Sequence, residues 1–253
     1  MTRFLVLGSN SFSGATFCGH LAAAGHEVIA TSRSPEPHEA FLPYRWRAGA
    51  VRFVQVDINR DLEALDALLR AERPSHVVNF AAQSMVGESW RTPEHWMMTN
   101  VVSTTVLFER LRRLDWLERY VHVTTPEVYG STEGWVREDA NFNPTTPYAV
   151  SRAAGDMQLR IVVAQYGFPA VSTRAANVYG PGQQTYRIIP RTILSAMAGR
   201  KLQLHGGGKS IRSFIHMRDV SEATLRIALA GEVGETYHIS TERMVSIREL
   251  VAM

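Results

Sequence analysis

Residues 3–14, RFLVLGSNSFSG, pass from a short apolar run into a turn of glycines and serines. The apolar run predicts a buried strand, and the residues after the turn predict a helix. Gly8 and Gly14 stand at the end of this strand and the start of this helix, where backbone N–H groups can receive a pyrophosphate. Ser11 occupies a position where a third glycine is expected, and its hydroxyl can bond phosphate. With Phe12, these residues form a predicted cofactor-binding turn, although glycines at such turns are also common for structural reasons alone.

The alternation of strand and helix continues along the chain. Six β-rich runs precede residue 176 and are separated by helical patterns. This order predicts an α/β fold with a doubly wound parallel sheet of the Rossmann type. We expect residues 1–176, joined again by 214–240, to form a dinucleotide-binding domain. Residues 177–213 and 241–253 should form a small, discontinuous substrate-binding lobe, and the abrupt end inside a helical pattern suggests that this lobe is truncated.

Composition excludes several classes of protein. Of the 253 residues, 45% are apolar, and 27 basic against 24 acidic side chains give a net charge of +3 with no basic block. This balance argues against a nucleic-acid partner and suits an anionic small ligand. Cys18 is the single cysteine, so we expect no disulfide, no thiolate metal site and a cytoplasmic location. The apolar run Phe4–Leu7 is too short for a signal peptide, and no stretch approaches the length of a membrane span.

The second predicted strand ends in Ser32, Arg33 and Ser34 instead of a carboxylate. An acidic residue at this point would bind a ribose 2′-hydroxyl, whereas arginine and serine can hold a 2′-phosphate. The cofactor is therefore NADP or NAD, with NADP slightly favoured, and the alternative is that Arg33 is a solvated loop residue. Asp57 ends the third predicted strand and either bonds an adenine amino group or caps a helix; Ile58 follows it in the predicted site.

Two later stretches carry candidate catalytic residues. In VTTPEVYG, Thr125 and Glu127 are two apart at a predicted strand end, so we expect them to point the same way into the ligand crevice. A buried carboxylate there can remove a proton next to a carbonyl, although Glu127 can equally be a structural residue of the rim.

In PTTPYAVSR, Thr146 and Pro147 predict a helix start, which places Tyr148 in the first turn and Arg152 one turn further. The cation predicts a lowered pKa for Tyr148 and a role as acid and base. A tyrosine and an arginine at this spacing usually lie on a helix surface by chance. This pair is more significant because Tyr148 follows Glu127 by 21 residues.

Six motifs in this order are similar to those of the extended short-chain dehydrogenases/reductases, in the nucleotide-sugar epimerase/dehydratase group. They are GSNSFSG, NFAAQSMVGESW, TTPEVYG, PYAVSR, RAANVYGPGQ and RSFIHMRDV. The resemblance covers essentially the whole chain. It implies that NAD(P) takes a hydride from the sugar C4 while Tyr148 takes the hydroxyl proton and Thr125 bonds the same oxygen. In the dehydratases of this group, the residue matching Glu127 removes the C5 proton, the C6 hydroxide leaves, and the hydride returns to C6.

The resemblance also implies ligand contacts and an assembly. Ala81, Ala82 and Gln83 line the nicotinamide side, and Asn100 matches a structural asparagine. The implied partner is a nucleotide-diphosphate sugar, and the protein is expected to be a homodimer built through a four-helix bundle. The residues assigned to the substrate are Ser84, Asn177, Arg187 and Arg212.

This chain departs from the family pattern at four points. Arg152 replaces the motif lysine, and its planar head differs from an ammonium in what it can reach. Pro126 stands where thymidine-sugar dehydratases carry an acid that protonates the departing hydroxide, so water or Glu127 must supply that proton. Ser11 replaces the middle glycine, and the chain is several tens of residues shorter than usual.

The presence of Glu127 favours an NAD(P)-dependent nucleotide-sugar 4,6-dehydratase, because 4-epimerases often lack a carboxylate at this position. The alternatives are a nucleotide-sugar 4-epimerase, a UDP-glucuronate decarboxylase and, from another class, a non-catalytic dinucleotide-binding sensor. Arg152 and Pro126 motivate the sensor; the joint presence of Thr125, Glu127 and Tyr148 argues against it.

Overall fold

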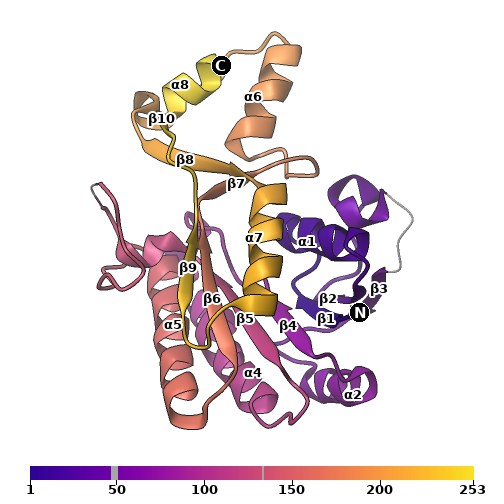
Figure 1. The fold of residues 1–253 in the computed structure, drawn as a ribbon. Helices are drawn as coiled ribbons and strands as arrows, with labels where there is room; N and C mark the ends of the chain where they lie inside the picture. The colour runs from indigo at the N-terminus through magenta and orange to yellow at the C-terminus, as the bar shows by residue number, and fades with distance from the viewer. Residues whose placement is uncertain (47–50, 133) are drawn as a thin grey trace.

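A seven-stranded parallel sheet forms the body of the molecule. The structure is a computed structural model that describes residues 1–46, 51–132 and 134–253. The strand order is β3-β2-β1-β4-β5-β6-β9 (Figure 1). Successive strands are added to one side of β1 as far as β3 and to its other side from β4 onward. This order confirms the predicted doubly wound sheet with six strands before residue 176. The strands are β1 Arg3–Leu7, β2 Glu27–Ser32, β3 Val51–Gln55, β4 His76–Asn79, β5 Arg119–Thr124, β6 Ala170–Ala175 and β9 Thr236–Ile239.

Helices cover both faces of this sheet, because strands with continuous apolar sequence have two faces to bury. On one face, α2 (Leu62–Glu72), α4 (Thr104–Leu111) and α5 (Pro147–Tyr166) enclose one apolar core. On the other face, α1 (Phe12–Ala23) and α7 (Met217–Ala230) enclose a second core (Figure 1). The sheet is thus held between two packed layers of helices.

The helical segment that contains Asn100 is not a single α-helix. After the short α3 (Pro93–Met97), residues Met98–Ser103 form a π-helical segment, and α4 begins only at Thr104. The Asn100 side chain leaves the helix surface and bonds both the N–H and the C=O of Gln83, each at 2.9 Å. π-Helical turns of this kind often mark functional sites, because they redirect one side chain.

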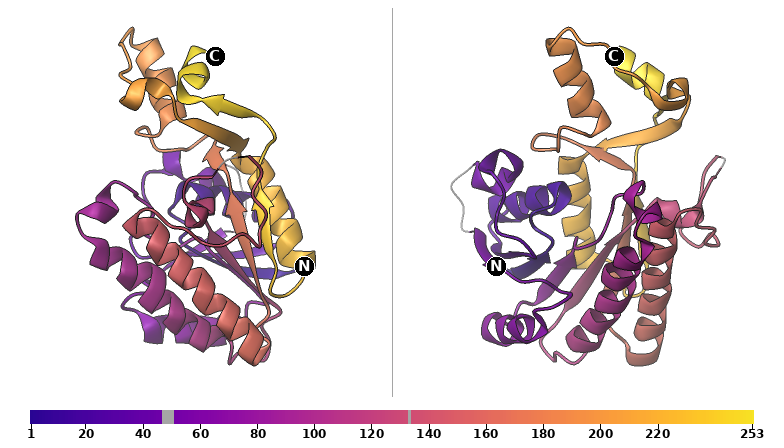
Figure 2. Two further views of the ribbon diagram at one scale, coloured as in Figure 1. Left: turned by 90° about the vertical axis from the view of Figure 1, so that its left-hand side faces the viewer. Right: turned by 180° about the vertical axis from the view of Figure 1, so that it is seen from behind.

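A smaller sheet rises beyond the carboxyl end of β6, as Figure 2 shows. Its strands are β7 (Asn177–Tyr179), β8 (Ile211–His216) and β10 (Met244–Ser246), flanked by α6 (Ile188–Met197) and α8 (Ile247–Ala252). Between β8 and β10 the chain returns to the main sheet through α7 and β9, and β9 pairs with β6. Short 3-10 turns complete the structure at Glu39–Phe41, Pro43–Arg45, Glu88–Trp90, Pro126–Tyr129 and His205–Gly208.

Among the residues that the structure describes, none of the helices combines the length and apolar character needed to cross a bilayer. The same residues contain no group of three or more histidine, cysteine, aspartate or glutamate side chains arranged to hold a metal ion.

Candidate active site

The β1–α1 turn is built from backbone at close quarters. Gly8 has φ +81°, and a Cβ atom there would lie 2.5 Å from the backbone N of Ala81. A Cβ at Gly14 would collide with the carbonyl oxygen of Gly8. Only glycine fits at these two positions, because β1, α1 and the loop after β4 approach one another so closely there. This is the close approach that a dinucleotide-binding turn needs, so the local structure fits the predicted cofactor.

Ser11 holds this turn together. Its hydroxyl donates to the C=O of Gly8 at 2.7 Å and accepts from the N–H of Gly14 at 3.1 Å, which makes it the N-cap of α1. A phosphate contact donated by this hydroxyl would have to replace the bond to Gly8. Phe12 buries its side chain against Met217 and Val220, while its N–H, at the first position of α1, has no intrahelical acceptor. Backbone donors are thus better placed to receive phosphate than the Ser11 hydroxyl.

The loop after β2 is tied to this turn. The Asn10 amide donates to the C=O of Ser34 at 2.9 Å, and the Gln55 amide donates to the C=O of Arg33 at 3.0 Å. Ser32 is the last residue of β2, and Arg33 is exposed with no ion pair among the described residues. The backbone geometry allows Arg33 to contact a 2′-phosphate, and this contact stays a prediction.

Asp57 shapes the turn that follows β3. Its Oδ1 accepts from the N–H of Asn59 at 2.9 Å, and its own N–H donates to Asp61 at 2.9 Å. Asp61, not Asp57, precedes α2. Ile58 is buried in the core beneath. One carboxylate oxygen of Asp57 remains for the predicted adenine contact.

The loop Ala81–Gln83 is positioned from two sides. The Asn79 side chain accepts from the N–H of Ala81 at 2.9 Å, and Asn100 clamps the backbone of Gln83. Asn100 also donates to Ser151 Oγ on α5 at 2.9 Å. Ala81, Ala82 and Gln83 are partly buried, and the next residue, Ser84, is exposed. The loop predicted to face the nicotinamide is therefore fixed to the helix that carries Tyr148.

Thr125 and Glu127 do not lie on a strand, so the argument that they share one face of a strand is wrong. β5 ends at Thr124, and Thr125 caps the 3-10 turn that contains Glu127 by accepting from its N–H at 3.3 Å. Thr125 is buried, whereas the Glu127 side chain opens to the cleft. Protein nevertheless surrounds this carboxyl closely enough that desolvation raises its pKa, while Arg212 and Arg187 oppose the rise. Glu127 is suited to hold a proton in the course of a reaction.

Tyr148 and Arg152 form a buried pair on α5. Thr146 caps this helix by accepting from the N–H of Ala149 at 3.1 Å, and the N–H of Tyr148 donates to Ser89 Oγ at 3.2 Å. The Arg152 guanidinium donates to the C=O of Val123 on β5. The predicted helix start is confirmed, with Arg152 one turn after Tyr148. Both side chains are buried.

The predicted lowering of the Tyr148 pKa is wrong in its net direction. Burial raises the pKa of Tyr148, and this effect outweighs the opposing charge of Arg152 and the nearby Thr125 hydroxyl. The charges of Glu127 and Asp156 add to the rise. The spacing of tyrosine and arginine identified the cation correctly, but it carried no information on how deeply the phenol is buried.

Three of the four predicted substrate residues lie on the smaller sheet and its loops, while Ser84 lies in the loop after β4. Asn177 begins β7, Arg187 precedes α6, Arg212 lies on β8, and all three are exposed. The charges of Arg187 and Arg212 both act on Glu127. The charges of two predicted anion-binding side chains therefore reach the candidate base.

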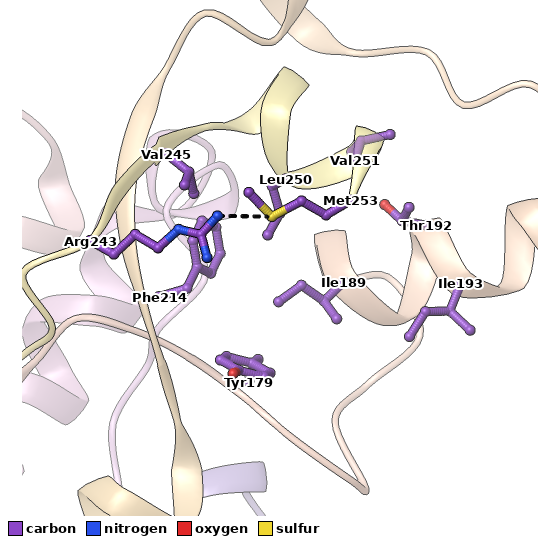
Figure 3. Close-up of a pocket in the computed structure, with 10 residues that line it drawn as sticks. All are labelled: Tyr179, Ile189, Thr192, Ile193, Phe214, Arg243, Val245, Leu250, Val251 and Met253. Carbon is purple, nitrogen blue, oxygen red and sulfur yellow. Dashed lines mark hydrogen bonds between the residues drawn. The ribbon is translucent and has the colours of Figure 1, made fainter.

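A cavity of about 330 Å³ lies elsewhere, between α6, α8 and the smaller sheet (Figure 3). Its walls are mostly apolar, and Arg243 reaches across it toward the sulfur of Met253 at 3.7 Å. None of the predicted site residues lines it. We therefore place the candidate chemistry in the open crevice at the carboxyl edge of the main sheet, not in this cavity.

Sequence reasoning missed a buried charged cluster behind Arg152. Asp156 lies one further turn along α5 and contacts Arg174 on β6 at 2.8 Å and His122 on β5 at 3.4 Å. All three side chains are almost completely buried. The available signal was the spacing of Tyr148, Arg152 and Asp156, which repeats every four residues along one face of a helix.

Comparison with known proteins places this arrangement in a class. Residues 4–240 match the model of the NAD dependent epimerase/dehydratase family, and the chain belongs to that family. A dTDP-glucose 4,6-dehydratase of Mycobacterium tuberculosis is 35% identical over 254 residues, which cover 95% of this chain and 72% of that protein. The family model and this relative confirm the predicted resemblance to the nucleotide-sugar dehydratases and epimerases.

Solved structures agree with this class. DesIV, a dTDP-glucose 4,6-dehydratase from Streptomyces venezuelae with NAD and TYD bound, superimposes with a TM-score of 0.89 at 32% identity; the match covers 99% of this chain and 79% of that one. A UDP-glucose 4-epimerase from Thermotoga maritima with UDP-glucose matches with a TM-score of 0.89 at 25% identity, covering 99% and 81%.

The chain is much shorter than some of its relatives. A trifunctional UDP-glucose 4,6-dehydratase/UDP-4-keto-6-deoxy-D-glucose 3,5-epimerase/UDP-4-keto-L-rhamnose-reductase of Arabidopsis thaliana is 35% identical over 196 residues. These residues cover 76% of this chain and 29% of the plant protein.

Proposed function

We propose that this chain catalyses the 4,6-dehydration of a nucleotide-diphosphate sugar with NAD(P) as cofactor. The observation that carries the proposal is the arrangement of Thr125, Glu127, Tyr148 and Arg152 beside a glycine turn that fits a dinucleotide. When bound, NAD(P) would accept a hydride from the sugar C4 and return it to C6. The family membership and the named dehydratases among its relatives support this reaction.

Tyr148 takes the proton of the C4 hydroxyl, because it is the buried acid–base group beside a fixed cation. Arg152 stabilises the phenolate form in which Tyr148 accepts this proton, and Thr125 bonds the C4 oxygen. Gly8, Gly14 and the N–H groups at the start of α1 hold the pyrophosphate, and the Ala81–Gln83 loop lies against the nicotinamide. Each of these roles follows from the position of the residue at the carboxyl edge of the sheet.

Glu127 removes the C5 proton, which a C4 ketone acidifies. Its raised pKa lets it retain this proton long enough to pass it on. Pro126 has no proton to give, so the departing C6 hydroxide takes its proton from Glu127 or from water. Arg187, Arg212 and Asn177 bind the diphosphate of the substrate, and Ser84 contacts the sugar.

A 4-epimerase is the second candidate, and two observations favour keeping it. Pro126 leaves the dehydration without a second acid, and a 4-epimerase is among the structures that match. Epimerisation needs only Thr125 and Tyr148 together with rotation of the sugar. A UDP-glucuronate decarboxylase would use the same C4 ketone, and a non-catalytic sensor would bind dinucleotide without turnover.

Turnover on a panel of nucleotide sugars separates these functions. The dehydratase gives a 4-keto product that absorbs in alkali, and Glu127→Gln lowers its formation by about 10²–10⁴-fold. Glu63→Gln, on the exposed first turn of α2, is the matched control and leaves turnover unchanged. Wild-type turnover in Glu127→Gln eliminates the dehydratase and leaves epimerisation. Dinucleotide binding with no turnover on any sugar supports the sensor.

Four further proposals concern the whole molecule. Residues 1–176 with 214–240 form the dinucleotide-binding domain, and residues 177–213 with 241–253 form part of the substrate lobe. The cofactor is NADP in preference to NAD, and the enzyme acts in the cytoplasm, as its single buried cysteine suggests.

The protein is a homodimer through the α4–α5 face, where apolar side chains are exposed. They are Met98, Val102, Val150, Met157, Ile161 and Tyr166. Mass measurement in solution tests the dimer.

A further inference from the structure

A compact group of charges lies directly behind the proposed proton acceptor. On α5, Tyr148, Arg152 and Asp156 follow one another at intervals of four residues and share one face of the helix. That face packs against β5 and β6 (Figure 1), which supply His122 and Arg174. Asp156 Oδ2 lies 2.8 Å from Arg174, and its Oδ1 lies 3.4 Å from His122 Nε2.

The charges in this group do not cancel. Arg152 and Arg174 contribute two positive charges, and Asp156 contributes one negative charge because its neighbours hold its pKa below the usual value despite burial. Burial lowers the pKa of His122, so this ring is neutral. The sum is +1, enclosed within side chains that are 3% exposed or less. A charge in such surroundings acts strongly on its neighbours.

The hydrogen bonding of the group is incomplete. Within the described part of the chain, Nε of Arg152, Nε of Arg174 and Oδ1 of Asp156 have no hydrogen-bond partner. Buried polar atoms without partners are costly, and native proteins tolerate them mainly where they serve a function. Arg152 has one carbonyl acceptor, on Val123, and no ion pair at contact distance among the described residues, so its charge is only partly neutralised.

We propose that Asp156 is a positioning residue for the Tyr148–Arg152 pair. Held between His122 and Arg174, its carboxylate is a buried negative charge one helical turn from Arg152, and it limits how strongly the arginine promotes ionisation of Tyr148. The inference rests on the proposed role of Tyr148 as proton acceptor. It explains how an arginine can work at this position: a fully unopposed guanidinium would lower the proton affinity of the Tyr148 phenolate and make it a weaker base for the C4 hydroxyl.

A second contact chain ties this group to the cofactor side. His122 Nδ1 lies 3.2 Å from the Tyr120 hydroxyl, which accepts from Asn79 at 3.0 Å, and Asn79 in turn accepts from the N–H of Ala81 at 2.9 Å. Asp156 is therefore linked through buried polar groups to the loop proposed to face the nicotinamide.

Other ionisable groups also act on this pair and must be kept constant in any test. Glu127, on the 3-10 turn after β5, raises the pKa of Tyr148, and the Thr125 hydroxyl lowers it. Tyr129, on the same turn, accepts a hydrogen bond from Arg174. The groups that face Asp156 are His122 from β5, Arg174 from β6, and Tyr148 and Arg152 from α5 itself.

The experiment titrates Tyr148 directly in the protein saturated with NAD⁺. Near-ultraviolet absorbance of tyrosinate is measured against pH, and the curve of a Tyr148→Phe counterpart is subtracted so that only Tyr148 remains. In Asp156→Asn the midpoint of this difference curve should fall by roughly one pH unit, because the negative charge near Arg152 is lost. The acid side of the turnover profile should move in the same direction.

Two further variants separate this role from mere folding. Asp156→Asn/Arg174→Met removes both members of the buried ion pair, which is often tolerated where removal of one member is not. It should lower the midpoint by less than Asp156→Asn does, because the loss of Arg174 removes a positive charge as well. Asp156→Glu keeps the charge and should keep the wild-type midpoint.

An unchanged midpoint in folded Asp156→Asn overturns the proposal; where Asp156→Asn does not fold, a midpoint in the folded double variant that is unchanged or raised overturns it. The titration needs no sugar, so a shifted midpoint in a protein that turns over no nucleotide sugar would support the role of Asp156 and refute the dehydratase separately.

Discussion

Backbone forms one side of the crevice, and side chains form the other. At the β1–α1 turn the site consists of backbone, and its geometry depends on side chains that are absent from Gly8 and Gly14. On the α5 side the site consists of side chains, and its chemistry depends on Tyr148 and Arg152 being buried together. One side excludes added atoms, whereas the other responds to added or removed charge.

This difference predicts how each side fails. A methyl group added to the glycine turn displaces backbone and weakens cofactor binding, with the acid–base groups left intact. A single hydroxyl or charge removed on the α5 side stops proton transfer, with the cofactor still bound. Measurements of binding and turnover on matched variants can therefore confirm or break the division.

Tyr148→Phe should have the largest effect. Turnover should fall by about 10²–10⁴-fold, the contribution of a positioned acid–base group. Cofactor affinity should stay within about twofold, since the helix start is held by Ser89 and Thr146 and not by the phenol. The control is Tyr166→Phe, at the exposed end of the same helix, which should leave turnover unchanged. A parallel loss of cofactor binding in Tyr148→Phe would erase the distinction between the two sides.

Gly8→Ala tests the backbone side, and the chain supplies a matched control. Gly8 and Gly25 have the same φ of +81°, but a Cβ at Gly25 has nothing within 4 Å. Gly25→Ala should cost about 1 kcal/mol of unfolding free energy from the left-handed backbone alone. Gly8→Ala should cost roughly 1–3 kcal/mol more from the collision with Ala81.

Cofactor affinity provides the functional measure for this pair. It should drop by about 100-fold in Gly8→Ala, because a backbone shift of this kind weakens several phosphate bonds together, each worth about 1–2 kcal/mol. It should not change in Gly25→Ala. Equal affinities in the two variants, measured by titration calorimetry, would contradict the close-packing argument.

What the sequence predicts follows the same division. The glycine turn and the strands of the main sheet were predictable because steric demands and apolar runs are local in sequence. The meeting of Asp156 with Arg174 was not, since 18 residues separate them and only the packing of α5 on β6 joins them. The direction of the Tyr148 pKa shift was also missed, because burial is a property of the folded environment and not of residue spacing.

The environment of Glu127 gives a smaller, pH-dependent effect. Burial raises the pKa of Glu127, and Arg212 is the first of the two arginines that hold it back. Arg212→Met should raise the pKa further. Because Glu127 accepts a proton only when ionised, the acid side of the turnover profile should move to higher pH by up to about one unit. Arg212→Lys should move it less, and Arg200→Met, which is exposed after α6, should not move it.

The same pKa shift has a consequence for stability. A carboxyl whose pKa is raised by folding favours the folded state below its unfolded pKa, and this contribution is lost as pH rises through the raised folded pKa. At neutral pH, Glu127→Gln should therefore unfold at a higher temperature than the wild type, while at acidic pH the two should converge. A lower melting temperature at neutral pH would show that Glu127 stabilises the fold and that its desolvation has been overstated.

Arg33→Ala should have the smallest effect, and it probes the one place where the backbone side relies on a side chain. Arg33 is exposed, so its bond to a 2′-phosphate is partly screened and should contribute roughly 1 kcal/mol. Affinity for NADP should fall by about fivefold, while affinity for NAD, which lacks that phosphate, should not change. Arg60→Ala, another exposed arginine, is the control. Equal losses of affinity for NADP and NAD would show that Arg33 does not bind the 2′-phosphate. Cofactor recognition on this side would then depend on backbone alone.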